Sequence, residues 1–207
     1  MERFTETGKD FPLHFYVGRL LRWYLELTSH RIKVITLVRD PVARYISAQF
    51  QTLDHEPIPQ DDPDAAVRQL QDTVRRGRKV RFDWFEREMK TLLGVNPLAE
   101  PFDREVGYSL LNAPRADILV LKLECLSDLI PGVVSSFVGK ELSVVQANRG
   151  NKKDYADYYQ EVLKRLQLTE ETCREVYSHE HVTHFYTSGE IDQFVQKWTD
   201  QSAVRQT

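Results

Sequence analysis

Two side chains, Arg39 and Ser47, have the types and the spacing to hold a phosphate group between them. Arg39 directly follows the apolar run IKVITLV of residues 32–38, and Ser47 stands eight positions further on. A guanidinium offers a planar set of donors that matches phosphate oxygens and stays charged, and a hydroxyl adds a neutral donor. Arg44, three residues before Ser47, falls on the same side of a helix and adds positive charge. The spacing therefore indicates an anion-binding site.

A buried strand followed by a capped helix would hold these side chains in place. The β-branched, nearly all-apolar run 32–38 is typical of a parallel strand that is covered on both faces. Asp40 suits the N-cap and Pro41 the first helical position, so the pattern predicts a helix over 41–53. The free N–H groups and dipole of such a helix end favour an anion. In α/β folds, ligands bind beyond the carboxyl ends of the strands, where Arg39 stands.

The rest of the chain alternates between strand and helix patterns. The expected strands are 11–16, 32–38, 107–111, 118–123 and a weak one at 142–145, and the expected helices are 17–27, 41–53, 64–76, 82–93, 126–138, 154–167, 169–178 and 188–199. Gly94 is expected to end one helix, and Pro131 to sit in the first turn of another. Residues 54–63 predict a surface loop and 148–153 a polar turn. This order of elements predicts an α/β layer fold with a mostly parallel sheet.

The chain has the size and composition of one globular domain. Its 207 residues predict a single domain, with an α/β core over 10–150, a helical insert over 64–94 and a helical C-terminal extension over 151–200. The net charge of -3 gives no general attraction to nucleic acid. No run approaches the roughly 18 apolar residues of a membrane-spanning helix. Two cysteines and the absence of a signal-like start favour a cytoplasmic protein with reduced thiols.

A family resemblance rests on the pattern Arg-Asp-Pro-x-x-Arg-x-x-Ser, formed here by Arg39, Asp40, Pro41, Arg44 and Ser47. This pattern resembles the 3'-phosphate motif of carbohydrate sulfotransferases, which use 3'-phosphoadenosine 5'-phosphosulfate (PAPS). By itself it fits an ordinary helix start equally well, with Asp40 as the cap and Arg39 in a salt bridge. Further blocks resemble the capsular polysaccharide synthesis proteins, a sulfotransferase-like group: Asp83-Trp84-Phe85-Glu86, Gly94-Val95-Asn96, Gly107-Tyr108, Leu123-Glu124, Asn151-Lys152, Tyr155-Ala156, His184-Phe185-Tyr186-Thr187 and Trp198. The resemblance covers roughly residues 10–200.

This resemblance implies a P-loop-NTPase-like parallel sheet flanked by helices and a sulfuryl transfer from PAPS to a saccharide hydroxyl, without a metal. The acceptor would be a carbohydrate such as a capsular or surface polysaccharide. Arg39, Ser47 and Arg44 would bind the 3'-phosphate. The position of the turn 148–153 suggests Arg149 and Lys152 as further phosphate ligands, and a solvated turn is the equal alternative. His14, on the expected strand 11–16, matches the place of a general base in some of these enzymes; a half-buried histidine with a hydrogen bond is the alternative.

One part of the sulfotransferase pattern is missing. These enzymes open with a strand, a Gly/Ser/Thr-rich loop carrying Lys or Arg, and a helix, which together hold the 5'-phosphosulfate. Nothing before Arg39 has that form, because Thr5-Glu6-Thr7-Gly8-Lys9 follows no strand and Pro12 opposes a helix directly after it. Two interpretations stay open: an enzyme whose chain here is incomplete at its N-terminus, or a non-catalytic sulfotransferase-like binding module.

Other groups of residues suggest chemistry less specifically. Five basic residues within 75–81 would suit an acidic sugar or a polyanion, but acidic neighbours also suit a solvated face. His179, His181 and His184 do not have zinc spacing, so helix-end and packing roles are expected for them. Glu124, at the end of a strand, is expected to be structural. The aromatic residues of the C-terminal helices are expected to form core, which disfavours a nucleic-acid surface.

Overall fold

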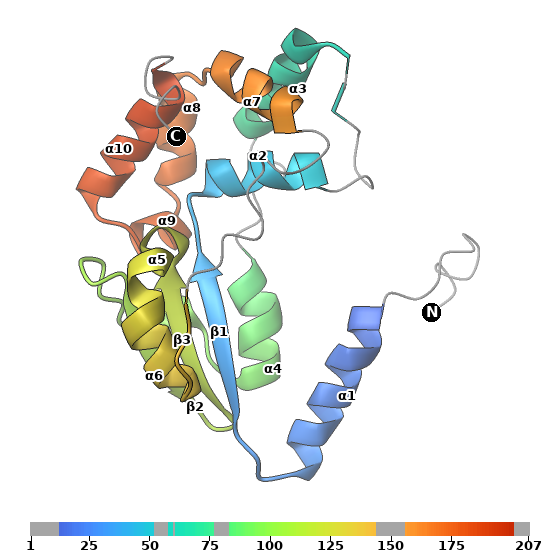
Figure 1. Cartoon of the computed structure of the whole chain (residues 1–207), viewed down its shortest axis with the longest axis vertical. Coiled ribbons are helices and arrows are strands. Elements are labelled where there is room, and N and C mark those ends of the chain that lie inside the picture. Colours follow the sequence, from blue (N-terminus) through green and yellow to red (C-terminus); the bar gives the residue numbers. More distant parts are fainter. Residues whose placement is uncertain (1–12, 52–57, 60, 77–82, 144–155, 201–207) are drawn as a thin grey trace.

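The computed structural model describes residues 13–51, 58–59, 61–76, 83–143 and 156–200 (Figure 1). Three strands are present among them: β1 (Ile32–Val38), β2 (Tyr108–Ala113) and β3 (Ala116–Lys122). The α-helices are α1 (Leu13–Leu27), α2 (Pro41–Gln51), α3 (Pro63–Arg75), α4 (Thr91–Leu93), α5 (Leu126–Leu129), α6 (Ser135–Val138), α7 (Ala156–Arg165), α8 (Glu170–Tyr177), α9 (Glu180–Thr183) and α10 (Ser188–Thr199). A π-helical turn, Phe85–Lys90, precedes α4, and another, Ile130–Val134, joins α5 to α6. None of the described helices has the length and apolar character to cross a membrane.

The sheet is mixed, with strand order β1-β3-β2. β1 runs parallel to β3, with Val38 opposite Lys122, whereas β2 runs antiparallel to β3 with Ala113 opposite Ala116. The prediction of a mostly parallel sheet was therefore wrong for one of the two pairings. The reason is the short link between β2 and β3: two residues can join antiparallel neighbours, but a parallel pair needs a long crossover.

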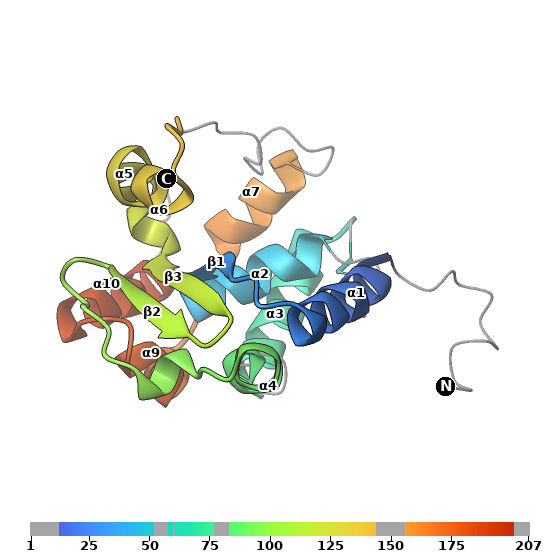
Figure 2. The ribbon, with the colours of Figure 1, turned by 90° about the horizontal axis from the view of Figure 1, so that it is seen from below.

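Helices cover both faces of this sheet, which confirms the predicted α/β layering. Leu119 and Leu121 of β3 pack against the α5–α6 segment on one face. Ile118 and Val120 point to the other face and join the main core. Figure 2 shows α5 and α6 on one side of the sheet, and α4 and α9 on the other. This alternation follows from the two-residue period of a strand. The carboxyl ends of β1 and β3 lie together, where α2 begins (Figure 1).

The start of the chain differs from its prediction. The expected strand 11–16 is wrong over its described part, because α1 begins at Leu13 and continues through the whole run. A six-residue apolar run is too short for its periodicity to distinguish a strand from a helix. The helix predicted to follow it therefore includes the end of the run. His14 consequently lies in the first turn of a helix instead of on a strand. Residues 11 and 12 lie outside the described ranges.

Most other elements lie where the sequence predicts them. Gly94 ends α4 in the left-handed conformation, with φ of 76°, as expected. Pro131 does not begin its helix, however: it lies inside the π turn, where the Ser135 hydroxyl donates to the Ile130 carbonyl oxygen at 2.8 Å. Proline cannot donate a backbone hydrogen bond, and the wider turn accommodates it. The short helix α9 was not predicted. Leu142 and Ser143 are not in a strand, and the rest of the expected strand 142–145 and the turn 148–153 lie outside the described residues.

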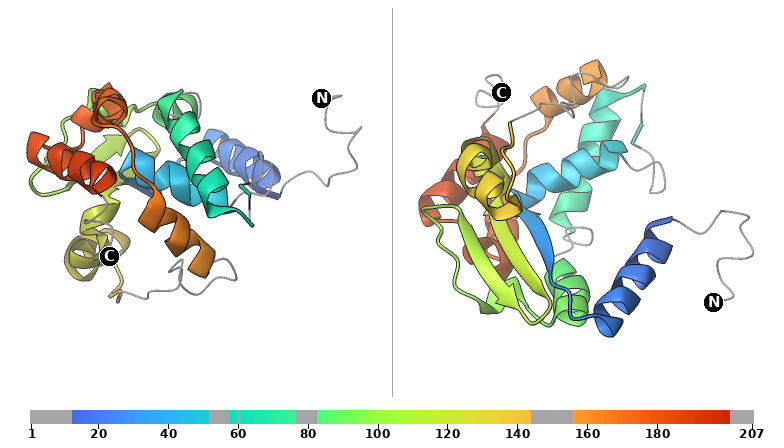
Figure 3. Two further views of the ribbon diagram at one scale, coloured as in Figure 1. Left: turned by 90° about the horizontal axis from the view of Figure 1, so that it is seen from above. Right: turned by 60° about the horizontal axis from the view of Figure 1, so that its bottom comes forward.

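The C-terminal helices pack onto the end of β1 and onto α2. Viewed from above, α2, α3, α7, α8 and α10 form a helical group over the carboxyl ends of the strands (Figure 3). Buried residues of this group, such as Val42, Ile46, Leu70, Val162 and Tyr177, belong to the same core as the sheet. The junction of β1 and α2 is therefore held from several directions, which fixes the position of the residues that follow the strand.

Candidate functional site

Asp40 is the residue that fixes the junction of β1 and α2. Its side chain is only 2% exposed. Oδ1 accepts hydrogen bonds from the N–H groups of Val42 (3.0 Å) and Ala43 (3.3 Å) and from the Tyr177 hydroxyl (2.8 Å), and Oδ2 accepts one from Trp198 Nε1 (2.9 Å). Asp40 is thus the predicted N-cap. Because it occupies these N–H groups, the expectation that the helix end leaves free N–H groups for an anion was wrong.

Glu124, in the helical turn directly after β3, supports the same junction, as expected for a structural residue. Its Oε1 accepts a hydrogen bond from the backbone N–H of Asp40 at 2.9 Å, and its Oε2 accepts one from the Tyr186 hydroxyl at 3.0 Å. Burial, followed by the charge of Glu124, raises the pKa of Tyr186 far above its usual value, so this hydroxyl stays protonated and donating. Both oxygens of Glu124 are therefore used in holding the fold.

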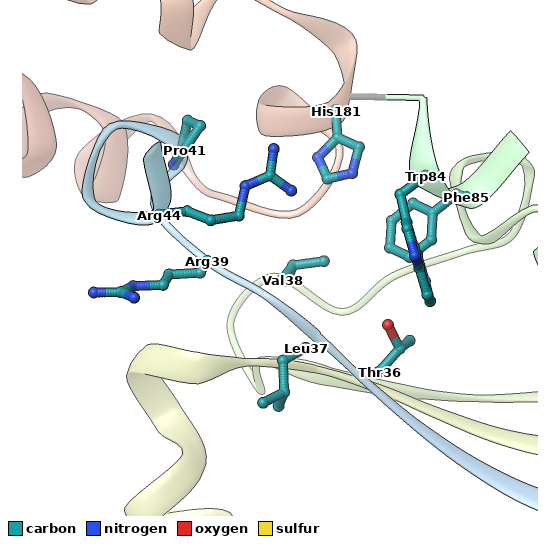
Figure 4. A pocket seen from close by; sticks show the side chains of 9 residues that line it. All are labelled: Thr36, Leu37, Val38, Arg39, Pro41, Arg44, Trp84, Phe85 and His181. Atoms are coloured by element: carbon teal, nitrogen blue, oxygen red, sulfur yellow. The ribbon is translucent and has the colours of Figure 1, made fainter. Parts of the chain in front are cut away.

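Beside this junction lies a pocket of about 240 Å³, which we call the Arg44 pocket (Figure 4). It is formed by the end of β1, the start of α2, the segment before α4, and α9. Its lining residues are Thr36, Leu37, Val38, Arg39, Pro41, Arg44, Trp84, Phe85 and His181. Trp84 is 46% exposed and forms one wall, with Phe85 behind it at a centroid distance of 5.4 Å. The pocket lies at the carboxyl end of β1, where ligands of α/β folds gather.

The lining is positively charged. Two of the nine described lining residues are arginines, and none of these nine is acidic. Burial lowers the pKa of Arg44 from its usual value, but a guanidinium remains charged at any physiological pH. Such a combination of cations, an aromatic wall and no carboxylate favours an anionic ligand that has a flat or apolar part.

His181 provides an uncharged nitrogen base next to these cations. Its ring stacks on Phe85 at 5.0 Å with an interplanar angle of 11°, and Figure 4 shows the Arg44 guanidinium extending toward it. Burial, and then the positive charge of Arg44, lower the pKa of His181 to about 4. At neutral pH the imidazole is therefore uncharged.

This environment predicts how His181 titrates. In the folded chain, its imidazole should titrate near pH 4, and in the urea-unfolded chain near the usual 6.5. Because the unfolded state takes up the proton first, the contribution of this residue to stability is lost as the pH falls from 6.5 toward 4. Long-range proton–nitrogen NMR spectra follow the ring directly. In Arg44→Ala the pKa should rise, because a neighbouring cation is removed; an unchanged value would contradict the assigned cause.

The predicted site residues are brought together only in part. Arg39 and Arg44 both line the pocket, but Figure 4 shows the Arg39 side chain extending away from Arg44, Trp84 and His181. Arg39 continues the alternation of β1 and falls on the side of Leu37, opposite Thr36 and Val38. Ser47 is not among the described lining residues, and the side chain of His14 is not described. Arg149 and Lys152 lie outside the described residues.

Sequence reasoning missed Thr36, Trp84, Phe85 and His181 as site residues. Thr36 is one of two polar residues, with Lys33, in an otherwise apolar strand, and a polar residue there can mark a side chain that faces something other than core. Trp84 and Phe85 were recognised only as a sequence block. No sequence pattern distinguished His181 from its neighbouring histidines as a site residue, because its position depends on how α9 packs against the segment before α4.

The remaining candidate groups have mainly structural roles in the described part of the chain. Arg75 and Arg76 form ion pairs with Asp72, while the rest of the basic cluster within 75–81 lies outside the described residues. His179 caps α9, since its Nδ1 accepts from the His181 N–H at 3.1 Å, which confirms a helix-end role. The described aromatic residues of the C-terminal helices are core, as expected.

A family model assigns the chain to a known group of proteins. The model described as "Putative capsular polysaccharide synthesis protein" matches residues 67–187, which is more than half of the chain. The chain therefore belongs to this capsular polysaccharide synthesis family. The match includes Trp84, Phe85 and His181, whereas Arg39 and Arg44 precede it. No curated protein and no solved structure matches the chain.

Proposed function

We propose that this protein binds PAPS and takes part in transferring its sulfuryl group to a saccharide hydroxyl during capsular polysaccharide synthesis. The observation that carries the proposal is the Arg44 pocket, at the carboxyl end of a parallel strand. Its described lining has two guanidiniums, an exposed indole and no carboxylate. Family membership supplies the capsular context. A P-loop-NTPase-like fold belongs to this proposal as well, because the sulfotransferases share it.

In this proposal the 3'-phosphate of the nucleotide binds to side chains. Asp40 already occupies the first N–H groups of α2, so Arg44 is the principal ligand. Arg39 joins it by a change of side-chain rotamer, since it already lines the same pocket. Ser47, one turn beyond Arg44, and the predicted ligands Arg149 and Lys152 complete the set. The flat face of Trp84 offers a stacking surface for a base or a sugar. His14 stays the predicted candidate for a general base on the acceptor hydroxyl.

Titration calorimetry with adenosine 3',5'-bisphosphate tests this site. Wild type should bind, and Arg44→Ala should bind at least tenfold more weakly, since a charge-assisted hydrogen bond contributes about 1.5–3 kcal/mol. Arg39→Ala should weaken binding as well. Arg68→Ala is the matched control, because Arg68 lies exposed on α3, outside the pocket, and should leave affinity unchanged. Adenosine 5'-monophosphate should bind less well, because it lacks the 3'-phosphate. No heat with wild type, or equal heats with Arg44→Ala, would remove the nucleotide site.

A second candidate is a binding module without sulfotransferase activity. The Arg44 pocket would suffice for it, because binding a nucleotide needs only the cations and the stacking surface of the pocket. Such a module would bind the nucleotide but leave the sulfate on it. Incubation with sulfur-35-labelled PAPS and an acidic polysaccharide separates the two: labelled polysaccharide supports the enzyme, and binding without label transfer supports the module.

A further inference from the structure

Helix α1 exposes an apolar face that the rest of the described chain does not cover. Tyr16, Val17, Leu20, Trp23, Tyr24 and Leu27 have exposed fractions between 42% and 65%. On the other side of the helix, Leu25 is 2% exposed and Leu21 packs against the core. Figures 1 and 3 show α1 at the edge of the molecule, with its N-terminal end directed away from the sheet. A helix that is apolar on two opposite sides is normally covered on both.

The exposed residues follow the spacing of a helix–helix seam. With Leu20 and Leu27 at position a of a heptad, Tyr16 and Trp23 fall at position d, and Val17 and Tyr24 at position e. Leu21 and Leu25 fall at b and f, on the side that faces the body. The seam and the body contact are thus separate faces, so a second helix can approach without displacing α1.

We propose that α1 pairs with α1 of a second copy of this chain, antiparallel and about a two-fold axis. In this register Leu20 packs on Trp23 of the partner subunit, and Tyr16 packs on Leu27 of the partner subunit, each contact occurring twice by symmetry. Each layer joins a bulky aromatic side chain to a leucine, so large and smaller side chains alternate along the seam.

The flanking positions fit this same register. On one side of the seam, Arg19 meets Glu26 of the partner subunit, an opposite-charge pair that the symmetry repeats. On the other side, Val17 meets Tyr24 of the partner subunit, which is an apolar pair. A parallel arrangement would instead place Arg19 near the partner's Tyr24, with no charged partner. The charges and the apolar layers thus select the antiparallel pair together. Glu26 also forms an ion pair with Arg22 of its own helix at 2.9 Å, and its second oxygen is available to the partner's arginine.

The size of the seam indicates a reversible dimer. The three aromatic side chains alone expose on the order of 300 Å², given about 150–250 Å² for each whole side chain. The whole face is smaller than the roughly 800 Å² per partner of a standard stable interface. We therefore expect dimers at high concentration that dissociate on dilution.

Sedimentation equilibrium of the 207-residue chain over a wide concentration range measures this association. The wild type should approach twice the 24.2 kDa chain mass as its concentration rises. Arg19→Glu and Glu26→Arg should each weaken the dimer about 3- to 30-fold, because each converts two attractive pairs into repulsive ones. The double variant R19E/E26R should recover affinity to within about threefold of wild type, because both pairs re-form with reversed polarity.

Two further variants complete the test. Leu20→Lys should abolish association, and circular dichroism should show an intact fold because Leu20 is exposed in the monomer. Arg68 is an exposed residue of α3, away from α1. Arg68→Glu changes the net charge as Arg19→Glu does and should leave the dimer affinity unchanged. A wild type that stays monomeric at every concentration, or binds lipid vesicles as a monomer, would overturn the proposal. A double variant as weak as the singles would overturn it too. None of these outcomes depends on nucleotide binding.

Discussion

Asp40→Ala should lower the free energy of unfolding by about 3–5 kcal/mol, because it removes a buried carboxylate on which several donors converge. The Tyr177 hydroxyl and Trp198 Nε1 would both lose their acceptor inside the core, and α2 would lose its N-cap. Burial, and then the charge of Asp40, raise the pKa of Tyr177 far above its usual value, so this hydroxyl is always available as a donor. Urea unfolding followed by tryptophan fluorescence measures the change.

The chain contains a matched control for this substitution. Asp62-Pro63 begins α3 in the same way that Asp40-Pro41 begins α2, and Asp62 caps the N–H groups of Asp64 and Ala65. Asp62 is exposed and its cap is local, so Asp62→Ala should cost only about 1 kcal/mol. The difference between the two substitutions isolates the tertiary hydrogen bonds of Asp40. If both cost the same, the junction would not depend on Tyr177 and Trp198 as we conclude. Asp40→Asn, which keeps one acceptor oxygen, should fall between them.

The second large effect concerns Lys122 at the end of β3, which is 1% exposed. Its ammonium group lies 2.6 and 2.7 Å from the two oxygens of Glu190 and also donates to the Arg104 carbonyl oxygen. Glu190→Ala should therefore cost about 3–5 kcal/mol, because a buried cation loses its counter-charge and α10 loses its capping box with Thr187. Thermal and urea unfolding measure the loss. Lys122→Met should cost less, because the carboxylate that it leaves behind is partly exposed and still caps α10.

Acid should remove the stability that the Lys122–Glu190 ion pair contributes. Burial acts to raise the pKa of Glu190, but the hydrogen bonds from Lys122 and Thr187 outweigh it and hold the pKa below its usual 4.5. The unfolded state consequently takes up the proton first as the pH falls below 4.5, and the stability that this pair contributes is lost through the lower, folded pKa. In Lys122→Met, the loss of unfolding free energy that comes from protonating Glu190 should be smaller. An unchanged acid profile would assign the dependence to other carboxylates.

The two proposals are independent in structure as well as in their tests. The Arg44 pocket lies at the carboxyl end of β1, whereas the exposed seam of α1 precedes the amino end of that strand (Figure 1). A dimer built on α1 would therefore leave the pocket open, and nucleotide affinity should be the same in Leu20→Lys and in wild type.

The resemblance anticipated the capsular polysaccharide synthesis family, and the order of its blocks along the chain was the useful signal. It did not anticipate the geometry of the Arg44 pocket. Arg39 and Ser47 were expected to share a ligand, but Arg44 is the arginine that points into the pocket, and Ser47 does not line it (Figure 4). Helical spacing places Arg44 and Ser47 on similar sides of α2. It does not predict which turn of α2 the other segments pack against to form a pocket.

The amino-acid sequence by itself determined the features whose causes are local. The strand before Arg39, the Asp-Pro start of α2 and the glycine stop after α4 depend on neighbouring residues, and each was read correctly. Only the tertiary structure decided which distant side chains meet. It made Asp40 and Glu124 parts of one buried hydrogen-bond network and brought His181 and Trp84 to Arg44. It also left one apolar side of α1 uncovered. The physical reason is that burial and long-range hydrogen bonds are properties of packed layers, and no short stretch of residues contains them.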